Sequence, residues 1–539
     1  MKPKLTILFL LFVSIHLSAQ QYSAQRAVEN YLTDENPADG RLPVQPSSAR
    51  QFTNPVIPGD FADPTIIRMG NTYFAAGTSS EWAPHYPVFE SKDLINWSYT
   101  GPAFATKPEW TKGSFWAPEL FVFNEKVYLY YTARRASDGV SYIGVAVTDD
   151  IRKGFQDYGC LVEFGTEAID AFVFEDEGKL YVSWKAYGLD PRPIELLCAE
   201  LSSDGLKLAG EPFMLLKDEE NIGMEGQYMY KEGNYYYIIY SILGCCGANS
   251  NYAVCVARSE SLRGPYEKYE GNPILQGDGE TVLSCGHGTV VEAPDGKTLY
   301  LFHAYLKGAG FYNGRQAFLK ELAMNENGWP YFITGKYASV REPMPFDKMK
   351  QNEIPHFEDY FAGNVIRPEW SWNFTFSDIR TKIENNTLFL TGAPLKGNEY
   401  GTALCLRTLK PDYEITTEIK DQKGIFSGLT LYGDKDNLVI LGKESGHIVL
   451  KQIRKGVETL LYQKTAAGNV HLKIAVSNGC RASFFQSSDR ENWTPLPIAG
   501  KQETDVSYLP PWDRAFRPGL IHIGSETVPA EFTYCKLSY

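Results

Sequence analysis

The chain has 539 residues, of which 43% are hydrophobic and 22% are charged. These proportions are typical of globular proteins and argue against a disordered chain or a coiled coil. Acidic residues (65) outnumber basic residues (52), which gives a net charge of −13, and no dense run of Lys and Arg is present. This balance argues against a nucleic-acid partner and against binding to an anionic membrane surface.

The N-terminus has the pattern of a signal peptide. Lys2 and Lys4 precede a run over residues 5–13 that is apolar except for Thr6, and small residues around Ala19 offer a cleavage position. The run is too short to span a bilayer, so we expect no membrane insertion. We expect residues 1–19 to be removed, residues 20–51 to be a leader or linker, and the protein to be secreted or periplasmic. A buried N-terminal strand is the alternative.

Cysteine usage leaves two interpretations open. The chain has nine cysteines, an odd number that cannot be fully paired, and it contains no CxxC motif and no Cys/His zinc spacing. Cys245 and Cys246 are adjacent in the sequence. They could form a vicinal disulfide in an oxidising compartment, or they could be two reduced, half-buried thiols.

Five segments of the chain share one pattern. Each opens with a distinctive residue and a small residue or Pro, followed by a short apolar run, a turn and a Tyr-rich run, which is typical of a β-hairpin. The segments begin at Asp63, Ala117, Asp170, Glu225 and His287, at intervals of 54, 53, 55 and 62 residues. Strand-rich repeats with a period of about 50 residues are typical of β-propellers. We therefore predict an all-β protein in which residues 52–345 form a five-bladed β-propeller.

Three of the five segment starts are carboxylates: Asp63, Asp170 and Glu225. The first strand of each propeller blade lines the central channel, so these starts should meet at one end of the axis. Unpaired buried carboxylates are costly, and three at equivalent positions therefore indicate a functional site.

Two carboxyls across a small cavity can cleave a glycosidic bond: one donates a proton to the leaving oxygen, and the other activates water or attacks the sugar. A third negative charge would raise the pKa of the acid.

Seven motifs resemble, in their order along the chain, the pattern of glycoside hydrolase family 43. They are PGDFADPTIIRMGNTYFAAG (58–77), SKDLINW (91–97), FWAPELF (115–121), IDAFVFEDEGKLYVSW (169–184), MEGQYMYKEGNYYYIIYS (224–241), GHGTVV (286–291) and NGR (313–315). The resemblance covers about residues 52–345. It implies a five-bladed propeller and an inverting enzyme that acts on xylosides, arabinofuranosides or related glycosides.

The resemblance also implies a role for each carboxylate. Asp63 matches the general base that activates water, and Glu225 matches the general acid. Asp170 matches the third carboxylate, which tunes the pKa of the acid and orients it. Because inversion needs room for a water molecule, we expect the carboxyls of Asp63 and Glu225 to lie ~6.5–9.5 Å apart.

Four further residues are candidates for contacts with substrate. His287 matches a histidine beneath the site that lies near a hydrated calcium ion in some family members. A hydrogen-bonding or buried structural role is the alternative for His287. Calcium is the only metal that the resemblance suggests, and we expect the protein to require no cofactor. Arg315 matches a substrate-contacting arginine. Trp116 and Trp82 are candidates for stacking on a sugar ring, with packing in the core as the alternative.

The C-terminal third has a different pattern. Residues 346–357 are expected to form a linker, and residues 358–539 contain short alternating segments separated by turns at intervals of about 10 residues, which predicts a β-sandwich. The arrangement, with SSDRENWTPL (487–496), is similar to the concanavalin-like module of many family 43 xylosidases. We expect this module to contribute a loop to the site or to cover a blade, rather than to bind carbohydrate by itself.

The sequence thus predicts an exported inverting glycoside hydrolase that releases terminal β-D-xylosyl or α-L-arabinofuranosyl units from plant-type polysaccharides or oligosaccharides. The alternatives on the same fold are an exo-galactosidase or galactofuranosidase and an endo-arabinanase. A non-catalytic carbohydrate-binding propeller is an alternative of a different class. The three carboxylates argue against it, because a lectin needs no base opposite an acid.

Overall fold

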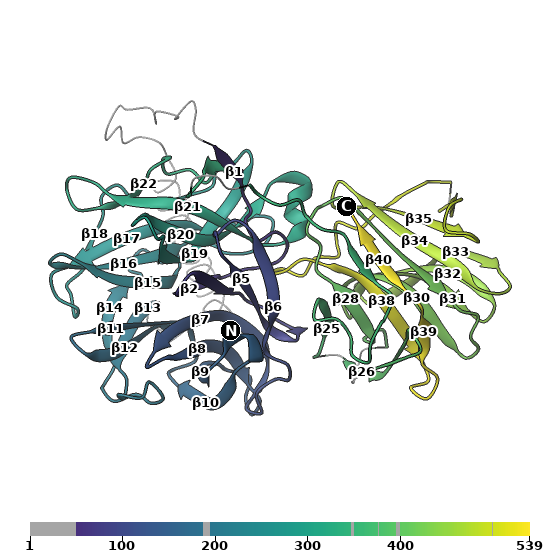
Figure 1. The fold of residues 1–539 in the computed structure, drawn as a ribbon, viewed down its shortest axis with the longest axis horizontal. Helices are drawn as coiled ribbons and strands as arrows, with labels where there is room; N and C mark the ends of the chain where they lie inside the picture. Colours follow the sequence, from purple (N-terminus) through teal and green to yellow (C-terminus); the bar gives the residue numbers. More distant parts are fainter. Residues whose placement is uncertain (1–49, 187–193, 347–349, 376, 395–398, 499) are drawn as a thin grey trace, which may run out of the picture.

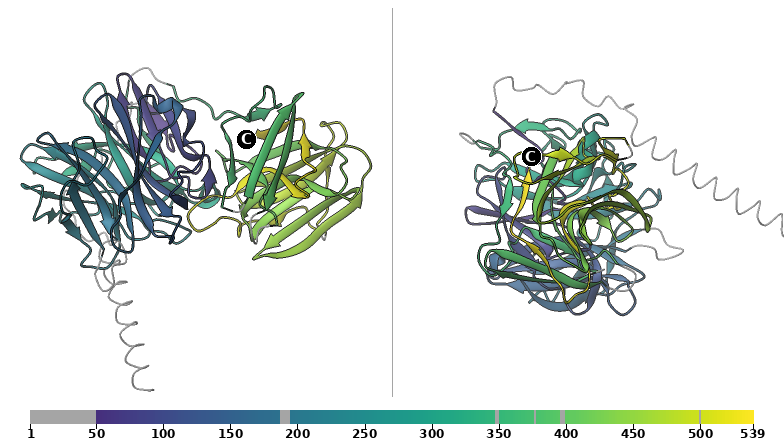
Figure 2. Two further views of the ribbon diagram at one scale, coloured as in Figure 1. Left: turned by 90° about the horizontal axis from the view of Figure 1, so that it is seen from below. Right: turned by 90° about the vertical axis from the view of Figure 1, so that its right-hand side faces the viewer.

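The computed structural model describes residues 50–186, 194–346, 350–375, 377–394, 399–498 and 500–539. The predicted signal peptide (1–19) and most of the predicted leader (20–51) lie outside the described residues. The described chain forms two all-β domains side by side, a propeller followed by a sandwich (Figure 1). In Figure 2 the left view shows the two domains side by side from below, and the right view shows the sandwich in front of the propeller. No helix within the described ranges is long and apolar enough to cross a membrane.

The first domain contains five four-stranded antiparallel sheets, which are the five blades predicted from the repeats. The innermost strands are β2 (Thr65–Met69), β7 (Thr111–Phe123), β11 (Ala168–Asp176), β15 (Met224–Glu232) and β19 (Val282–Glu292). The second strands are β3 (Thr72–Ala76), β8 (Lys126–Arg135), β12 (Lys179–Ala186), β16 (Tyr235–Ile242) and β20 (Thr298–Leu306). The third strands are β5 (His85–Ser91), β9 (Ser141–Thr148), β13 (Glu195–Glu200), β17 (Ala253–Ser259) and β21 (Gln316–Met324). The outer strands are β6 (Trp97–Phe104), β10 (Gln156–Val162), β14 (Phe213–Lys217), β18 (Glu267–Lys268) and β22 (Pro330–Phe332).

The blades are arranged in a ring. Each innermost strand contacts the next, from β2 through β7, β11 and β15 to β19, and β19 contacts β2 again. Separate apolar clusters fill the interfaces between neighbouring blades. In one of them, Trp184 of the third blade is fully buried against Tyr130 and Val145 of the second. The Tyr-rich and β-branched segments form strands here because their large side chains pack between two sheets.

The two ends of the propeller meet outside the blades. β1 (Gln51–Thr53) pairs with β23 (Arg341–Pro343), which ends the domain. The Asn54 side chain donates to the carbonyls of Leu319 and Ser339 and accepts from the N–H of Leu319. Two short 3₁₀ helices, η1 (Ile151–Lys153) and η2 (Gly308–Asn313), lie in connections within the ring.

The second domain is a β-sandwich, as predicted. One sheet has the order β24 (Phe357–Asp359), β40 (Cys535–Ser538), β29 (Tyr413–Ile419), β34 (Val470–Ser477), β35 (Arg481–Ser487) and β36 (Thr494–Pro495), with β37 (Thr504–Asp505) also paired to β35. The other has the order β33 (Val457–Thr465), β32 (His447–Arg454), β31 (Asn437–Glu444), β30 (Ile425–Asp434), β38 (Arg517–Gly524), β28 (Ala403–Leu406), β25 (Trp370–Asn373) and β4 (Trp82–Ala83). A small third sheet contains β26 (Ser377–Glu384), β27 (Thr387–Pro394) and β39 (Ala530–Phe532).

One strand of the sandwich comes from the propeller. β4 lies in the first blade's sequence but pairs with β25, where Trp82 is opposite Asn373. Trp82 is only 1% exposed, it packs edge-on against Tyr432, and the Arg517 guanidinium lies 4.2 Å from its ring centroid. The expectation that Trp82 stacks on a sugar is therefore wrong. Its indole is buried where the two domains meet.

The domain junction also contains a cavity of about 940 Å³. Residues of both domains line it, among them Asp60 and Thr78 of the propeller and Arg407, Arg517 and Tyr539 of the sandwich. The three predicted catalytic carboxylates are not among its lining residues. This cavity is therefore a feature of the junction, and it shares one residue, Thr78, with the carboxylate cluster described next.

Candidate functional site

Four of the five predicted segment starts share an unusual backbone conformation. Asp63, Ala117, Asp170 and His287 have φ values of 50°, 41°, 59° and 44°, in the left-handed region that few side-chain-bearing residues adopt. In β7, β11 and β19 this residue lies where the pairing with the second strand of the blade shifts its register. Asp63 lies just before β2 and is separated from it by one Pro. The shifts bend each innermost strand at the same end of the propeller axis.

In the fourth blade, the left-handed position belongs to Gly226 (φ 60°), not to Glu225. The predicted register of this repeat was therefore wrong by one residue. A Cβ on Gly226 would lie 2.8 Å from Cγ of His287, so only glycine fits here. Glu225 precedes the bend, which gives its side chain a different approach to the site from those of Asp63 and Asp170.

Asp63 is held by hydrogen bonds to three neighbours. Its Oδ1 accepts a hydrogen bond from Nη1 of Arg315 (2.9 Å), its Oδ2 accepts one from Oγ1 of Thr78 (2.6 Å), and its N–H donates to Nδ1 of His303 (3.1 Å). Burial raises the pKa of the Asp63 carboxyl, but the charge of Arg315 is the largest of the effects that lower it, and the resulting pKa is well below its usual value. Asp63 is therefore ionised over the whole physiological pH range, as a general base must be.

The carboxylate of Asp170 accepts a hydrogen bond from the backbone of the neighbouring blade. Its Oδ2 accepts the N–H of Gly226 (3.2 Å), and its own N–H donates to Oγ1 of Thr132 (3.1 Å). Burial raises the pKa of Asp170 to about 6, with His287 lowering it and Glu225 raising it. Asp170 and Glu225 are thus linked both by charge and by a hydrogen bond to the residue that follows Glu225.

Glu225 has two side-chain partners. Nζ of Lys185 lies 2.5 Å from Oε2, and the hydroxyl of Tyr252 donates to Oε1 (2.9 Å). The side chain of Glu225 is 18% exposed, compared with 9% for Asp63 and 7% for Asp170, so it is the most accessible of the three carboxylates. Burial raises the pKa of Glu225, but Lys185 lowers it, and the net shift is downward. We expected a raised pKa at Glu225; Lys185, which the sequence reasoning missed, reverses the direction.

His287 joins the carboxylates. Its Nδ1 lies 3.5 Å from Oδ1 of Asp63 and 3.8 Å from Oδ2 of Asp170, so these two carboxyl oxygens are no further apart than the sum of the two distances. The N–H of His287 donates to Oγ of Ser241, the residue that pairs with Glu225 in the fourth blade. The structure thus brings Asp63, Asp170, Glu225 and His287 together at one end of the axis, as the repeats predict.

The predicted hydrated calcium ion would lie near His287. Within the part of the chain that the structure describes, no three His, Cys, Asp or Glu side chains are arranged to hold a metal ion. His287 by itself is a poor ligand for calcium, which prefers six to eight oxygen ligands. The calcium ion near His287 stays a prediction.

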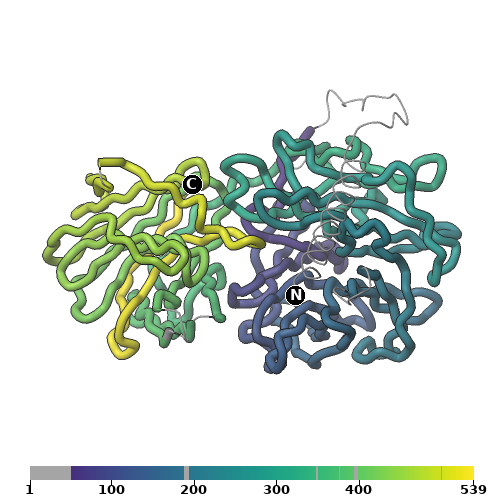
Figure 3. The backbone as a smooth tube through the Cα atoms, turned by 180° about the vertical axis from the view of Figure 1, so that it is seen from behind, coloured from purple at the N-terminus to yellow at the C-terminus, as the bar shows by residue number. Residues whose placement is uncertain are grey.

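Arg315 contacts a loop of the sandwich domain. It is 4% exposed, and its second nitrogen, Nη2, donates to the carbonyl of Asp513 (3.4 Å). Asp513 lies in the loop between β37 and β38, which extends from the sandwich to the propeller (yellow in Figure 3). In the same loop Asp513 accepts from Oγ of Ser80 (2.9 Å), and Arg514 forms an ion pair with Glu81 (2.6 Å). The expected contribution of a sandwich loop to the site is therefore present as a contact to Arg315.

Trp116 is partly buried beside Ala117, and the guanidinium of Arg134 lies 5.6 Å from its ring centroid. Its proposed stacking on a sugar stays a prediction.

Sequence reasoning missed the residues that support the carboxylates, namely Lys185, Tyr252, His303 and Thr78. Lys185 carried a readable signal, since it is a charged residue in the otherwise apolar run LYVSWKA (180–186). Tyr252 and His303 did not, because Tyr is common in every blade and His303 lies one strand away from the segment starts. Burial lowers the pKa of His303 to about 4, so the ring is neutral and Nδ1 can accept the N–H of Asp63.

The role of Lys185 can be tested by pH dependence. Lys185→Met removes the positive charge that lowers the pKa of Glu225, so this pKa should rise. If Glu225 must be protonated for catalysis, the alkaline limb of kcat/KM against pH should move to higher pH, by about one unit. Lys179→Met is the matched control, because Lys179 lies on the same strand but is exposed and pairs with Glu200. An unmoved alkaline limb in Lys185→Met would contradict the assignment of Glu225 as the acid.

The geometry supports a two-carboxyl reaction. An ionised Asp63, fixed by Arg315 and Thr78, lies in one cluster with an accessible Glu225 whose carboxylate form is stabilised by Lys185 and Tyr252. Such a pair can activate a water molecule on one side of a substrate and exchange a proton with a leaving group on the other.

Comparison with known proteins agrees with this chemistry. Residues 52–330 match the family model described as glycosyl hydrolases family 43. The chain is 27% identical over 508 residues to a beta-xylosidase of Bacillus subtilis, with 83% of this chain and 91% of that protein covered. It is 28% identical over 310 residues to an extracellular exo-alpha-(1->5)-L-arabinofuranosidase of Cellvibrio japonicus, with 50% and 86% covered. The crystal structure of a xylan beta-1,4-xylosidase from Bacillus halodurans superimposes with a TM-score of 0.78 at 21% identity, with 90% and 100% covered, which shows the shared fold.

Proposed function

The chain belongs to glycosyl hydrolases family 43, and we propose that it is an exported enzyme that releases terminal β-D-xylosyl or α-L-arabinofuranosyl units from plant-type polysaccharides or oligosaccharides. It is a glycoside hydrolase of an inverting family. The observation that carries the proposal is the meeting of Asp63, Asp170 and Glu225 around His287 at one end of the propeller axis. The names of the relatives, a beta-xylosidase and an exo-arabinofuranosidase, support a pentose as the released sugar.

In the proposed reaction Asp63 is the general base. Its carboxylate takes a proton from a water molecule as the water oxygen attacks the anomeric carbon from the face opposite the leaving oxygen. Arg315 and Thr78 keep the carboxylate in one orientation, and the charge of Arg315 keeps its pKa low, so no proton has to be removed before the reaction begins.

Glu225 is the proposed general acid. It donates its proton to the glycosidic oxygen as the bond to the sugar breaks, and it becomes a carboxylate. Lys185 and Tyr252 donate to that carboxylate and stabilise it once the proton has left. Asp170, whose Oδ2 accepts the N–H of Gly226, opposes the charge of Lys185 and orients the strand that bears Glu225.

The sandwich loop supports removal of terminal units rather than internal cleavage. Asp513 and Arg514 contact Ser80, Glu81 and Arg315, so a second domain covers one side of the carboxylate cluster. An enzyme that cleaves within a polymer needs a site open on two sides. Export is proposed from the N-terminal pattern, and three of the relatives are named extracellular.

The proposal is tested on substrates of defined structure. The purified protein is assayed on p-nitrophenyl β-D-xyloside, α-L-arabinofuranoside and β-D-galactoside and on 1,5-arabinan, and the first anomer released is identified by ¹H NMR. We expect a pentoside to be preferred and the released sugar to have the inverted configuration. Preference for the galactoside, or internal fragments from arabinan, would replace the proposed specificity with one of the alternatives. A retained configuration would refute the roles of Asp63 and Glu225.

A further inference from the structure

The loop over residues 243–252 leaves the fourth blade beside Glu225. It follows β16, in which Ser241 pairs with Glu225 and Ile242 pairs with Met224. Cys245 comes four residues after Ser241, so its Cα lies within about 14 Å of that of Ser241 even if the chain is fully extended. The loop ends at Tyr252, whose hydroxyl donates to Oε1 of Glu225. Both ends of the loop are therefore attached to the proposed proton donor.

The middle of the loop is anchored to the same region. Oγ of Ser284 donates to the carbonyl of Cys245 (3.0 Å) and accepts the N–H of Tyr252 (3.3 Å). The N–H of Gly247 donates to the hydroxyl of Tyr305 (3.2 Å). Two anchors on either side of Cys246 hold the loop in one position above the fourth and fifth blades.

Cys245 and Cys246 form a disulfide, which decides between the two interpretations left open by the sequence. Both residues are partly exposed, and the other seven cysteines are unpaired. A disulfide stabilises a fold mainly by closing a long loop in the unfolded chain, and the stabilisation grows with the number of residues enclosed. A bond between neighbouring residues encloses none, so its effect is local. It forms a rigid, polarisable, largely apolar surface patch.

An exposed tryptophan from the sandwich lies next to this patch. Trp512 is 64% exposed, and its carbonyl oxygen lies 3.4 Å from the position that a Cβ on Gly247 would occupy. The residue that follows it, Asp513, is bound to Ser80 and to Arg315. The segment that carries Trp512 thus adjoins the loop that carries the disulfide, beside Tyr252, which contacts Glu225, and Arg315.

We propose that the Cys245–Cys246 disulfide and Trp512 form the wall that binds the leaving-group sugar of the substrate. This inference rests on the proposed function, because the leaving group is the part of a glycoside that faces the proton donor. A sugar ring has an apolar face formed by its C–H groups, and a flat aromatic ring beside a rigid apolar loop is suited to cover it. The wall would act on binding and would take no part in proton transfer.

The test compares two substrates that differ only in the leaving group. One is the disaccharide of the preferred pentose, and the other is the glycosyl fluoride of the same pentose in the same anomeric configuration, whose leaving group is a single atom. In Cys245→Ala/Cys246→Ala, kcat/KM on the disaccharide should fall about tenfold, mainly through a higher KM, while kcat/KM on the fluoride stays unchanged. Trp512→Ala should show the same pattern and supplies a second variant at an exposed position.

Controls separate this effect from general damage. Cys160→Ala removes an exposed unpaired cysteine, and Tyr360→Ala removes a 55% exposed aromatic residue of the sandwich; both should leave both substrates unaffected. Treatment of the wild type with tris(2-carboxyethyl)phosphine should reproduce the defect on the disaccharide and should have no effect on the double alanine variant. Equal losses on both substrates, or no loss on the disaccharide in any variant, would overturn the inference while leaving the proposed function intact. A wild type that hydrolyses neither substrate would overturn both.

Discussion

Glu225→Gln is expected to lower kcat on the disaccharide of the preferred pentose by about 10³-fold. The amide cannot donate a proton to the glycosidic oxygen, and a sugar alkoxide is a poor leaving group. On a 2,4-dinitrophenyl glycoside the loss should be within about tenfold, because this leaving group departs as a stable anion without a proton. The ratio of the two losses measures how much of the role of Glu225 is proton donation.

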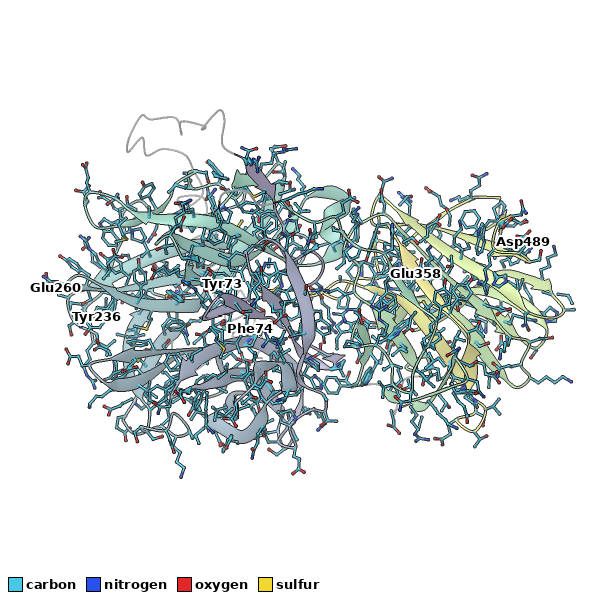
Figure 4. All side chains as sticks on the ribbon, in the orientation of Figure 1. Tyr73, Phe74, Tyr236, Glu260, Glu358 and Asp489 are labelled. Carbon is cyan, nitrogen blue, oxygen red and sulfur yellow. A yellow bond between two sulfur atoms is a disulfide. The ribbon has the colours of Figure 1, made fainter. Side chains whose placement is uncertain are left out.

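The control for this prediction is Glu260→Gln. Glu260 is exposed and lies at the outer edge of the propeller, at the end away from the sandwich (Figure 4). It should keep wild-type rates on both substrates. Equal losses in Glu225→Gln on the disaccharide and the dinitrophenyl glycoside would show that Glu225 does not act as a proton donor.

Asp63→Asn is expected to lower kcat by about 10³-fold or more, and by a similar factor on both substrates. The base acts on the attacking water, so a better leaving group does not compensate for its loss. The ion pair to Arg315 and the hydrogen bond from Thr78 also lose their charged partner, which adds disorder to the position of the remaining amide. The measurement is kcat on the same two substrates used for Glu225→Gln.

The matched control is Asp149→Asn, since the side chain of Asp149 is 83% exposed and its ion pair with Lys126 lies on the surface. It should leave both rates unchanged. A loss in Asp63→Asn that is large on the disaccharide but small on the dinitrophenyl glycoside would reverse the roles assigned to Asp63 and Glu225. Circular dichroism and thermal unfolding of each variant distinguish a lost reaction from a lost fold.

The fold and the identity of the three carboxylates could be predicted from the sequence because both rest on local signals. Each β-hairpin of the propeller joins strands that follow one another in the chain, so its apolar runs and turn lie within about 20 residues. The repetition of these hairpins at a nearly constant interval then indicates a ring. Asp63, Asp170 and His287 occupy equivalent positions in that ring, and the symmetry of the fold brings them together.

Other features of the site depend on contacts that no local pattern shows. In the fourth blade the left-handed position lies one residue later than predicted, because Gly226, and not Glu225, packs directly against His287. Lys185, on the second strand of the neighbouring blade, lowers the pKa of Glu225. The direction of this shift depends on how close the two side chains lie, which the sequence does not show. Whether a carboxyl is protonated depends on the nearest charges, which the order of residues does not reveal.

The sequence by itself determined the repeating strands, the choice of carboxyl groups and the class of reaction that they allow, because each of these depends on residue type and spacing. Only the tertiary structure decided that Trp82 is buried by β25, that Asp513 of the sandwich reaches Arg315, and that the Cys245–Cys246 disulfide adjoins Trp512. Each of these contacts joins residues more than 190 positions apart. Such contacts form when two domains pack, and the free energy of that packing depends on the shapes of both surfaces.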